Sequence, residues 1–175
     1  MNRKLTQSAI KLKKITVSAL FAALGACVGV IEGYIPSSVP LPGGRLGLSN
    51  VVTMVVLKAF GFKYALAVSA AKSLLTVLLS GKVTAFVYSL AGGIVSVIMM
   101  KLADKHIRGM SGIGCGIIGA WSNNIAQTAV GAAIMSDIHI MAYIWILGPV
   151  SVVTGAFTGL LSDYIGRKIR VWGKD

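Results

Sequence analysis

Several polar side chains lie inside long apolar stretches of this sequence. Lys72 lies near the middle of one stretch, and Asn123 and Gln127 are four residues apart in another, so the two amides share a helix face. A polar group at membrane depth is costly unless it binds a partner or lines a cavity. We therefore predict a pocket that binds a small-molecule substrate through hydrogen bonds and charge, built from these residues and the polar residues expected near them: Glu32, Arg45, Asn50, Lys72, Tyr88, Ser89, Asn123 and Gln127.

The same residues also fit a purely structural role. Asn, Gln and Ser side chains commonly hydrogen-bond helices to one another in membrane bundles. This alternative is strongest for Ser89 and weakest for Lys72, whose ammonium group needs a partner or a cavity. Glu32, at the end of the first apolar stretch, is the expected partner.

Residues 42–50 read Pro-Gly-Gly-Arg-Leu-Gly-Leu-Ser-Asn and form the most distinctive segment of the chain. Glycines permit tight turns, and Ser49 or Asn50 can cap the helix that follows. A helix N-terminus beside Arg45 favours an anion, so we expect an anionic or strongly hydrogen-bond-accepting ligand. An ordinary turn into the helix fits the segment equally well, and a pair between Lys72 and Glu32 would leave the site nearly neutral.

The sequence lacks the patterns of common catalytic and metal sites. Gly81-Lys82 comes closest to a nucleotide-binding phosphate loop, but Thr76 and Val83 occupy the positions that require glycine and Ser or Thr. The five acidic residues are scattered, whereas binding Mg²⁺ with a diphosphate needs clustered carboxylates. We expect no catalytic residue, no metal and no cofactor, and therefore no enzyme activity.

The elements that position the polar residues are expected to be transmembrane helices. The chain is 55% hydrophobic and 13% charged, against about 25% charged residues in soluble domains. Its 175 residues allow about six spans of roughly 20 residues each with short loops. We predict a single all-α membrane domain, a six-helix bundle, with spans at about 15–31, 49–60, 64–80, 84–100, 113–135 and 141–165. The span at 49–60 is the least certain because it is short.

The net charge of +12 fits a membrane topology better than nucleic-acid binding, because the Lys and Arg residues lie between the apolar stretches. They concentrate at both termini, in the turn near Lys63 and in the segment 101–108. The alternate loops hold only Arg45 and Lys82. The rule that cytoplasmic loops are basic therefore predicts both termini in the cytoplasm of a bacterial plasma membrane.

The first span carries alanines at helical spacing. Ala19, Ala22, Ala23 and Ala26 form a flat surface that can pack inside the bundle or against a separate membrane subunit. The nearby Leu24-Gly25-Ala26-Cys27 also resembles a lipoprotein signal, with Cys27 as the lipidated residue. Five further apolar stretches follow, which disfavours that interpretation.

Segments 41–50 and 88–93 carry a resemblance to a known family. The chain resembles the heptaprenyl diphosphate synthase component I family, also called the Gx transporter family, over about residues 10–165. That family is remotely similar to the substrate-binding S components of energy-coupling factor (ECF) transporters. The resemblance implies six helices, a 1–2 loop that closes an outward pocket, and first-span alanines that dock a separate transmembrane coupling subunit. It also implies separate ATPase subunits.

Two hypotheses of different kinds follow. The favoured one is the substrate-binding component of an ECF-type importer for a small vitamin-like or isoprenoid-precursor-like molecule. The alternative is a non-catalytic membrane subunit of an isoprenoid-synthase or flavin/quinone electron-transfer system. A lone enzyme is a third and weaker candidate. In every case we expect contact with membrane lipid and none with nucleic acid.

Overall fold

The computed structural model describes residues 2–34, 47–107 and 109–172, with side chains described for residues 7–169 of these ranges. This part of the chain contains helices and no strands. The elements in order are α1 (Asn2–Tyr34), α2 (Asn50–Phe60), α3 (Phe62–Ser80), α4 (Val83–His106), α5 (Gly112–Met135), the 3₁₀ helix η1 (Ile138–Tyr143) and α6 (Ile144–Trp172). A helix therefore lies at each of the six expected apolar stretches.

The helices are longer than the apolar stretches at the two ends of the chain. α1 begins at Asn2, well before the expected start of the span at residue 15, because Lys, Arg and Gln also favour helix formation. Two glycines with positive φ separate the shorter elements. Gly61 (φ 94°) breaks the chain between α2 and α3, and Gly81 (φ 68°) ends α3 in the left-handed conformation that glycine adopts readily.

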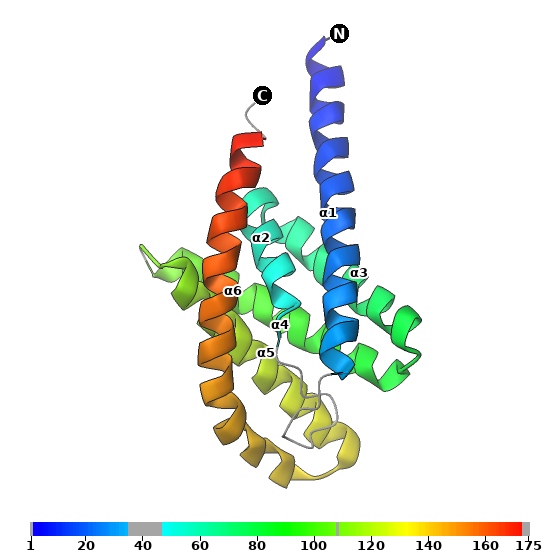
Figure 1. Cartoon of the computed structure of the whole chain (residues 1–175), viewed down its shortest axis with the longest axis vertical. Coiled ribbons are helices and arrows are strands. Elements are labelled where there is room, and N and C mark those ends of the chain that lie inside the picture. Colours follow the sequence, from blue (N-terminus) through cyan, green and yellow to red (C-terminus); the bar gives the residue numbers. More distant parts are fainter. Residues whose placement is uncertain (1, 35–46, 108, 173–175) are drawn as a thin grey trace.

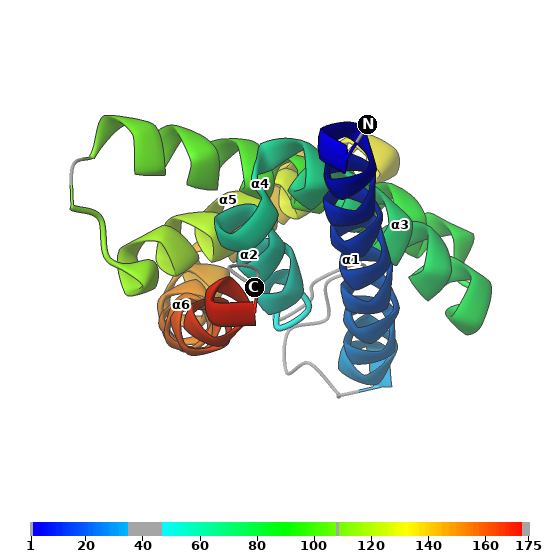
Figure 2. The same ribbon diagram turned by 90° about the horizontal axis from the view of Figure 1, so that it is seen from above.

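The short helix α2 lies at the centre of the bundle, between α1 and α6 (Figures 1 and 2). The helix that begins the chain and the helix that ends it project from the same end of the bundle (Figure 1). This shared end agrees with an even number of crossings. Whether that end faces the cytoplasm is a matter of membrane orientation and remains a prediction.

Four helical segments are long and apolar enough to cross a membrane: Gln7–Tyr34, Phe62–Ser80, Val83–His106 and Ile138–Ile169. The other two helices differ from these for physical reasons. α2 has 11 residues and spans about 16 Å, roughly half of a hydrocarbon core. α5 has 24 residues, but polar Ser, Asn, Gln and Thr side chains interrupt the middle of its apolar sequence.

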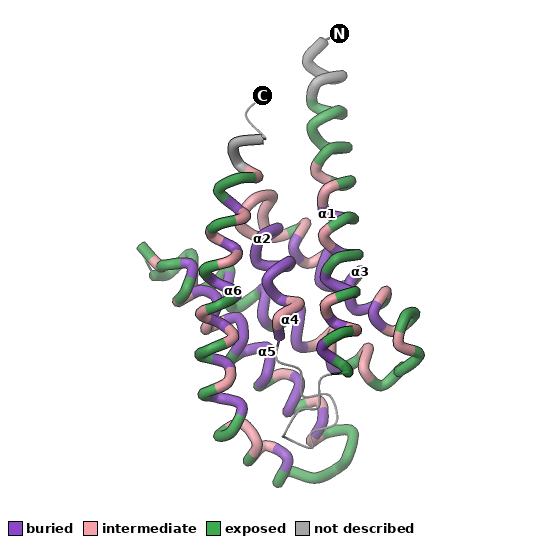
Figure 3. Tube along the Cα trace, in the orientation of Figure 1, coloured by how far each residue is buried: buried purple, intermediate pink, exposed green. Residues whose placement is uncertain are grey.

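Burial reverses the pattern of a soluble protein. Large apolar side chains are exposed around the outside, including Leu20, Leu78, Trp145, Val153 and Leu160, whereas polar side chains lie inside. Figure 3 shows α2 buried over most of its length, with its last turn of intermediate burial, and the outward surfaces of α1, α3 and α6 extensively exposed. In a lipid bilayer these apolar side chains contact hydrocarbon and not water, so an apolar exterior of this extent is typical of a membrane protein.

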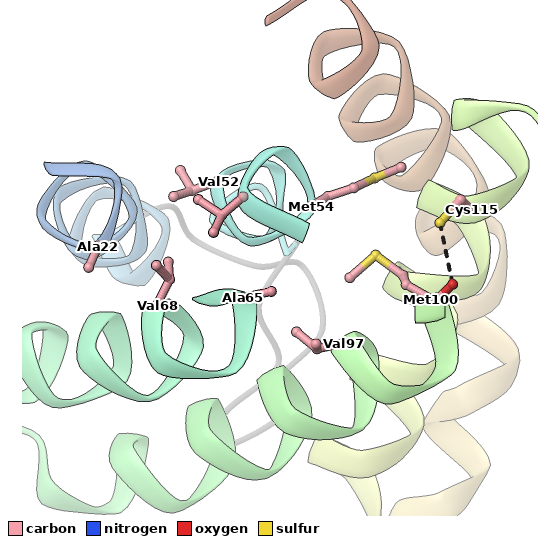
Figure 4. Close-up of a cluster of buried hydrophobic side chains, with 9 residues drawn as sticks. Ala22, Val52, Met54, Ala65, Val68, Val97, Met100 and Cys115 are labelled. Carbon is pink, nitrogen blue, oxygen red and sulfur yellow. Dashed lines mark hydrogen bonds between the residues drawn. The ribbon is translucent and has the colours of Figure 1, made fainter. Parts of the chain in front are cut away.

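One apolar cluster surrounds the buried side of α2 (Figure 4). It includes Val52 and Met54 of α2, Val68 of α3 and Met100 of α4. The thiol of Cys115 in α5 donates a long hydrogen bond to the carbonyl oxygen of Met100 (3.8 Å). This packing holds a helix that is too short to be placed by the membrane alone.

α5 and α6 pack through glycines on both helices. A Cβ atom added at Gly116 would overlap the carbonyl oxygen of Gly155 and lie 2.8 Å from the backbone nitrogen of Gly159. One added at Gly155 would lie 2.5 Å from the Cα atom of Ile117. The two backbones therefore touch directly, as small residues at four-residue spacing permit in membrane bundles.

An ion pair joins the other end of α2 to α6. The ammonium group of Lys58 lies 2.5 Å from the Asp163 carboxylate. A lysine near the end of an apolar helix commonly extends to the lipid headgroups. The structure gives Lys58 a carboxylate partner 105 residues away instead, which no local pattern indicates.

Candidate functional site

Glu32 of α1 binds the backbone that leads into α2. Its carboxylate accepts hydrogen bonds from the backbone N–H groups of Leu48 (2.5 Å) and Ser49 (3.4 Å). These two N–H groups directly precede α2, so the carboxylate lies at the N-terminus of the helix, where its negative charge interacts favourably with the helix dipole. Glu32 is itself buried.

Lys72 of α3 binds the same segment through its carbonyl and side-chain oxygens. Its ammonium group donates to the Ser49 carbonyl oxygen (3.1 Å), to Ser49 Oγ (3.4 Å) and to Asn50 Oδ1 (2.9 Å). Its side chain is 2% exposed, and its Cδ atom packs beside Gly25 of α1. The charge of Lys72 is therefore used to hold the start of α2 between α1 and α3.

Asn123 and Gln127 of α5 lie over one glycine of α4. A Cβ atom added at Gly92 would lie 2.5 Å from Asn123 Oδ1 and 3.0 Å from Gln127 Nε2. Only a glycine at position 92 leaves room for both amides between the two helices. The next residue, Gly93, leaves the same kind of room for Ser69 of α3.

The amides of α5 lie close to the entrance of α2. Gly47, which has a positive φ of 81°, lies beside both Asn50 Nδ2 and Asn123 Nδ2: a Cβ atom there would be 3.4 and 3.8 Å from them. We call Asn50, Asn123 and Gln127 the amide cluster. It lies between Gly47 and Gly92, where α2, α4 and α5 meet.

A second line of polar contacts extends from the amide cluster to α6. Asn123 Nδ2 lies 3.5 Å from Asn124 Oδ1, at the limit of a hydrogen bond. The Nδ2 group of Asn124 donates to Ser151 Oγ of α6 (2.7 Å), and Ser151 donates in turn to the carbonyl oxygen of Leu147. Asn124 therefore has the structural role of joining two helices.

Among the described residues, two atoms of the amide cluster are buried without a hydrogen-bond partner: Asn50 Nδ2, a donor, and Gln127 Oε1, an acceptor. The residues are 7% and 6% exposed. Leaving such a group unpaired costs about 1–3 kcal/mol, and proteins seldom leave one without a reason. Within the described part of the chain, the buried hydroxyls of Ser18, Thr53 and Ser69 also lack a hydrogen-bond partner.

The structure brings most of the predicted site residues into one region. Asn50, Lys72, Asn123 and Gln127 meet as described, and Glu32 joins them through Ser49. On α4, Ser89 shares a 2.9 Å hydrogen bond with Ser73, and the buried ring of Tyr88 packs against Gly131. Arg45 lies outside the described residues.

Sequence reasoning identified Lys72 on α3 but missed the three other polar residues on the same helix face. Ser69, Lys72, Ser73 and Thr76 are all buried, and their spacing of three and four residues is that of one helix face. This spacing was visible in the sequence and would have identified all four. Ser151 was also missed, because its partner Asn124 is 27 residues away.

The four alanines of α1 do not share one exposed surface. Ala22 and Ala26 are buried inside the bundle, while Ala19 and Ala23 are exposed. Ala19 and Ala22 also line an apolar groove of about 350 Å³ between α1 and α3. The predicted docking role therefore remains a proposal for Ala19 and Ala23, because the burial of Ala22 and Ala26 assigns them to packing within the chain.

A second cavity lies at the end of α2 remote from the amide cluster. It has a volume of about 570 Å³, and its lining includes the Lys58–Asp163 pair, Lys101 and Asp104.

Among the described residues, no three His, Cys, Asp or Glu side chains are grouped so that they could hold a metal ion.

The apolar exterior, the membrane-length helices and the buried polar residues define a multi-pass helical membrane protein. The chain belongs to the family described as heptaprenyl diphosphate synthase component I, whose sequence profile matches residues 21–165. This description names one component of a synthase. No curated protein and no solved structure matches the chain significantly.

Proposed function

We propose that this protein is the membrane-embedded substrate-binding component of an ECF-type importer for a small molecule. The observation that carries the proposal is the pair of unpartnered polar atoms, Asn50 Nδ2 and Gln127 Oε1, buried where three helices meet. In a purely structural cluster, the polar groups would be expected to form hydrogen bonds with one another. A ligand that supplies the missing partners explains why these two are left open.

The position of the amide cluster also supports binding from one side of the membrane. Residues 47–50 join the cluster to segment 35–46, which connects α1 to α2. The predicted topology places this connection on the outer side, because the basic residues gather at the opposite end. On this proposal the substrate enters from outside the bacterial plasma membrane, and both termini are cytoplasmic.

An importer of this kind needs energy from other chains. The sequence holds no phosphate loop, so ATP hydrolysis would belong to separate ATPase subunits. A separate transmembrane subunit would couple them to this chain. Ala19 and Ala23, which are exposed and one helical turn apart on α1, are the proposed docking residues.

The second candidate is a non-catalytic membrane subunit of an isoprenoid synthase. The family description favours it, since it names a component of such an enzyme. The described carboxylates form no cluster that could bind Mg²⁺ and a diphosphate, and a non-catalytic subunit needs none. In this role the protein would anchor or assist a separate catalytic chain.

Affinity purification from native membranes in mild detergent separates the two candidates. The importer proposal expects a transmembrane coupling protein and ATPases to co-purify with the full chain. Co-purification of a prenyl synthase, with no ATPase, would support the second candidate and overturn the first. An Ala19→Trp variant serves as the control, because it should lose the coupling protein and keep the fold.

A further inference from the structure

The amide cluster also indicates which class of substrate would fit, provided that the proposed function holds. We infer that the substrate is a neutral molecule that carries both a hydrogen-bond acceptor, such as a carbonyl oxygen, and an N–H or O–H donor. Its acceptor would bind Asn50 Nδ2, and its donor would bind Gln127 Oε1. Some polar groups of the site already have hydrogen-bond partners within the protein, and these two atoms do not.

The charged groups are used by the fold. Lys72 donates to two oxygens of Ser49 and to Asn50 Oδ1, and Glu32 accepts from the N–H groups of Leu48 and Ser49. The two charges are opposite in sign and bind the same short segment. A substrate carboxylate or phosphate would have to displace Lys72 from the three oxygen atoms to which it donates.

The open groups are neutral. Asn50 Nδ2 can only donate and Gln127 Oε1 can only accept, so together they match a molecule with one group of each kind. The orientation of the Asn50 amide is fixed by chemistry, because its oxygen faces the Lys72 ammonium at 2.9 Å and its nitrogen must point elsewhere. Asn123, beside both residues, is a third amide without charge.

This inference differs from the anionic ligand expected from the sequence. That expectation rested on the helix N-terminus beside Arg45, which lies outside the described residues, and it kept open a nearly neutral site if Lys72 paired with Glu32. With Lys72 bonded to α2, the open atoms of the amide cluster favour recognition by paired neutral hydrogen bonds. Such recognition discriminates strongly between similar ligands, because a ligand that lacks the donor or the acceptor leaves a buried atom of the protein without a hydrogen bond.

Two substitutions remove one open atom each and leave the fold's contacts in place. Asn50→Asp keeps an oxygen for Lys72 and loses the donor, and Gln127→Met keeps the chain length and loses the acceptor. Ser162→Ala is a matched control, because Ser162 is buried on α6 and bonds only within its own helix. All three variants are made in the full chain, and their unfolding temperatures are compared first.

The test uses a metabolite extract of the host cell, which is separated by ion exchange at pH 7. The anionic fraction binds an anion exchanger, the cationic fraction binds a cation exchanger, and the neutral fraction binds neither. Each fraction is added to the washed, detergent-purified protein, and the rise in unfolding temperature is measured. We expect the neutral fraction to stabilise the wild type and Ser162→Ala. The other two variants should need at least about fivefold more of it for the same rise.

Other results would refute the neutral substrate, the roles of the two atoms, or the proposed function. Stabilisation by the anionic or cationic fraction alone would refute the neutral substrate and leave the importer proposal standing. Wild-type responses of Asn50→Asp and Gln127→Met would refute the assignment of the two atoms. If Asn50→Asp fails to fold, Gln127→Met decides the question alone. If no fraction stabilises the wild type, the proposed function fails together with this inference.

Discussion

Glu32 of α1 and Lys72 of α3 both bind Ser49. The carboxylate of Glu32 accepts a hydrogen bond from the N–H group of Ser49, and the ammonium group of Lys72 donates to its carbonyl oxygen and hydroxyl. The two residues expected from the sequence to pair thus share a third residue. The result is a fixed start for α2, a helix too short to span the membrane.

Replacing Lys72 should therefore destabilise the whole bundle. Lys72→Met leaves the Ser49 carbonyl and Asn50 Oδ1 without their charged donor, and each such bond contributes about 1.5–3 kcal/mol. Thermal unfolding in detergent should show a marked loss of stability. Lys63→Met, at an exposed position of the same helix, should unfold like the wild type. Equal stability of the two variants would show that Lys72 does not hold α2.

The contact between α5 and α6 gives a second prediction. Gly116→Ala should destabilise the protein by about 1–3 kcal/mol, because its methyl group would overlap the backbone of α6. Gly114→Ala is the control: its added carbon would come no closer than 3.6 Å to another residue, and alanine favours helices. The two variants are compared by thermal unfolding. A Gly116→Ala protein as stable as the control would refute the close contact.

The proposed docking surface of α1 can be tested without disturbing the core. Ala19→Trp or Ala23→Trp should abolish co-purification of the coupling subunit and preserve the unfolding temperature, because both side chains are exposed. Leu78→Trp, at a position that is 71% exposed on α3, should leave assembly intact. If the docking variants lose stability instead of the partner, the surface packs within this protein.

The membrane orientation is open to cysteine labelling in whole cells. Cys27 is exposed and Cys115 is buried, so both are first replaced by serine. An impermeant maleimide added outside should label a cysteine at Tyr34, at the end of α1, and should spare one at Lys105, near the end of α4. Permeabilised cells should label both. Labelling of Lys105→Cys in intact cells would reverse the proposed orientation.

The local pattern of the sequence predicted the helices well and their mutual contacts poorly. Apolar stretches bounded by glycine and charged residues fix where α2 and α3 lie, since Gly61 and Gly81 end them. The spacing of Asn123 and Gln127 likewise placed both amides on one face. Spacing alone does not fix which face turns inward, which is why Ala22 and Ala26 were grouped with the exposed Ala19 and Ala23.

Long-range polar contacts were the least predictable features. Lys58 and Asp163 are 105 residues apart, and Asn124 and Ser151 are 27 residues apart, so no helical period connects them. The role of Lys72 was only partly visible for the same reason. Its need for a partner follows from its position in an apolar helix, but its bonds to Ser49 and Asn50 depend on where α2 packs.

The most direct test of the central claim is mass spectrometry of the small molecules that stay bound to the purified protein. The full chain is extracted from its native membrane in mild detergent, washed and denatured, and the released molecules are compared with those from Gln127→Met and Ser162→Ala. We expect one neutral small molecule, near one per chain, to be released from the wild type and from Ser162→Ala and to be strongly depleted from Gln127→Met. Equal amounts in all three proteins, or no molecule in the wild type, would contradict a substrate-binding site at the amide cluster.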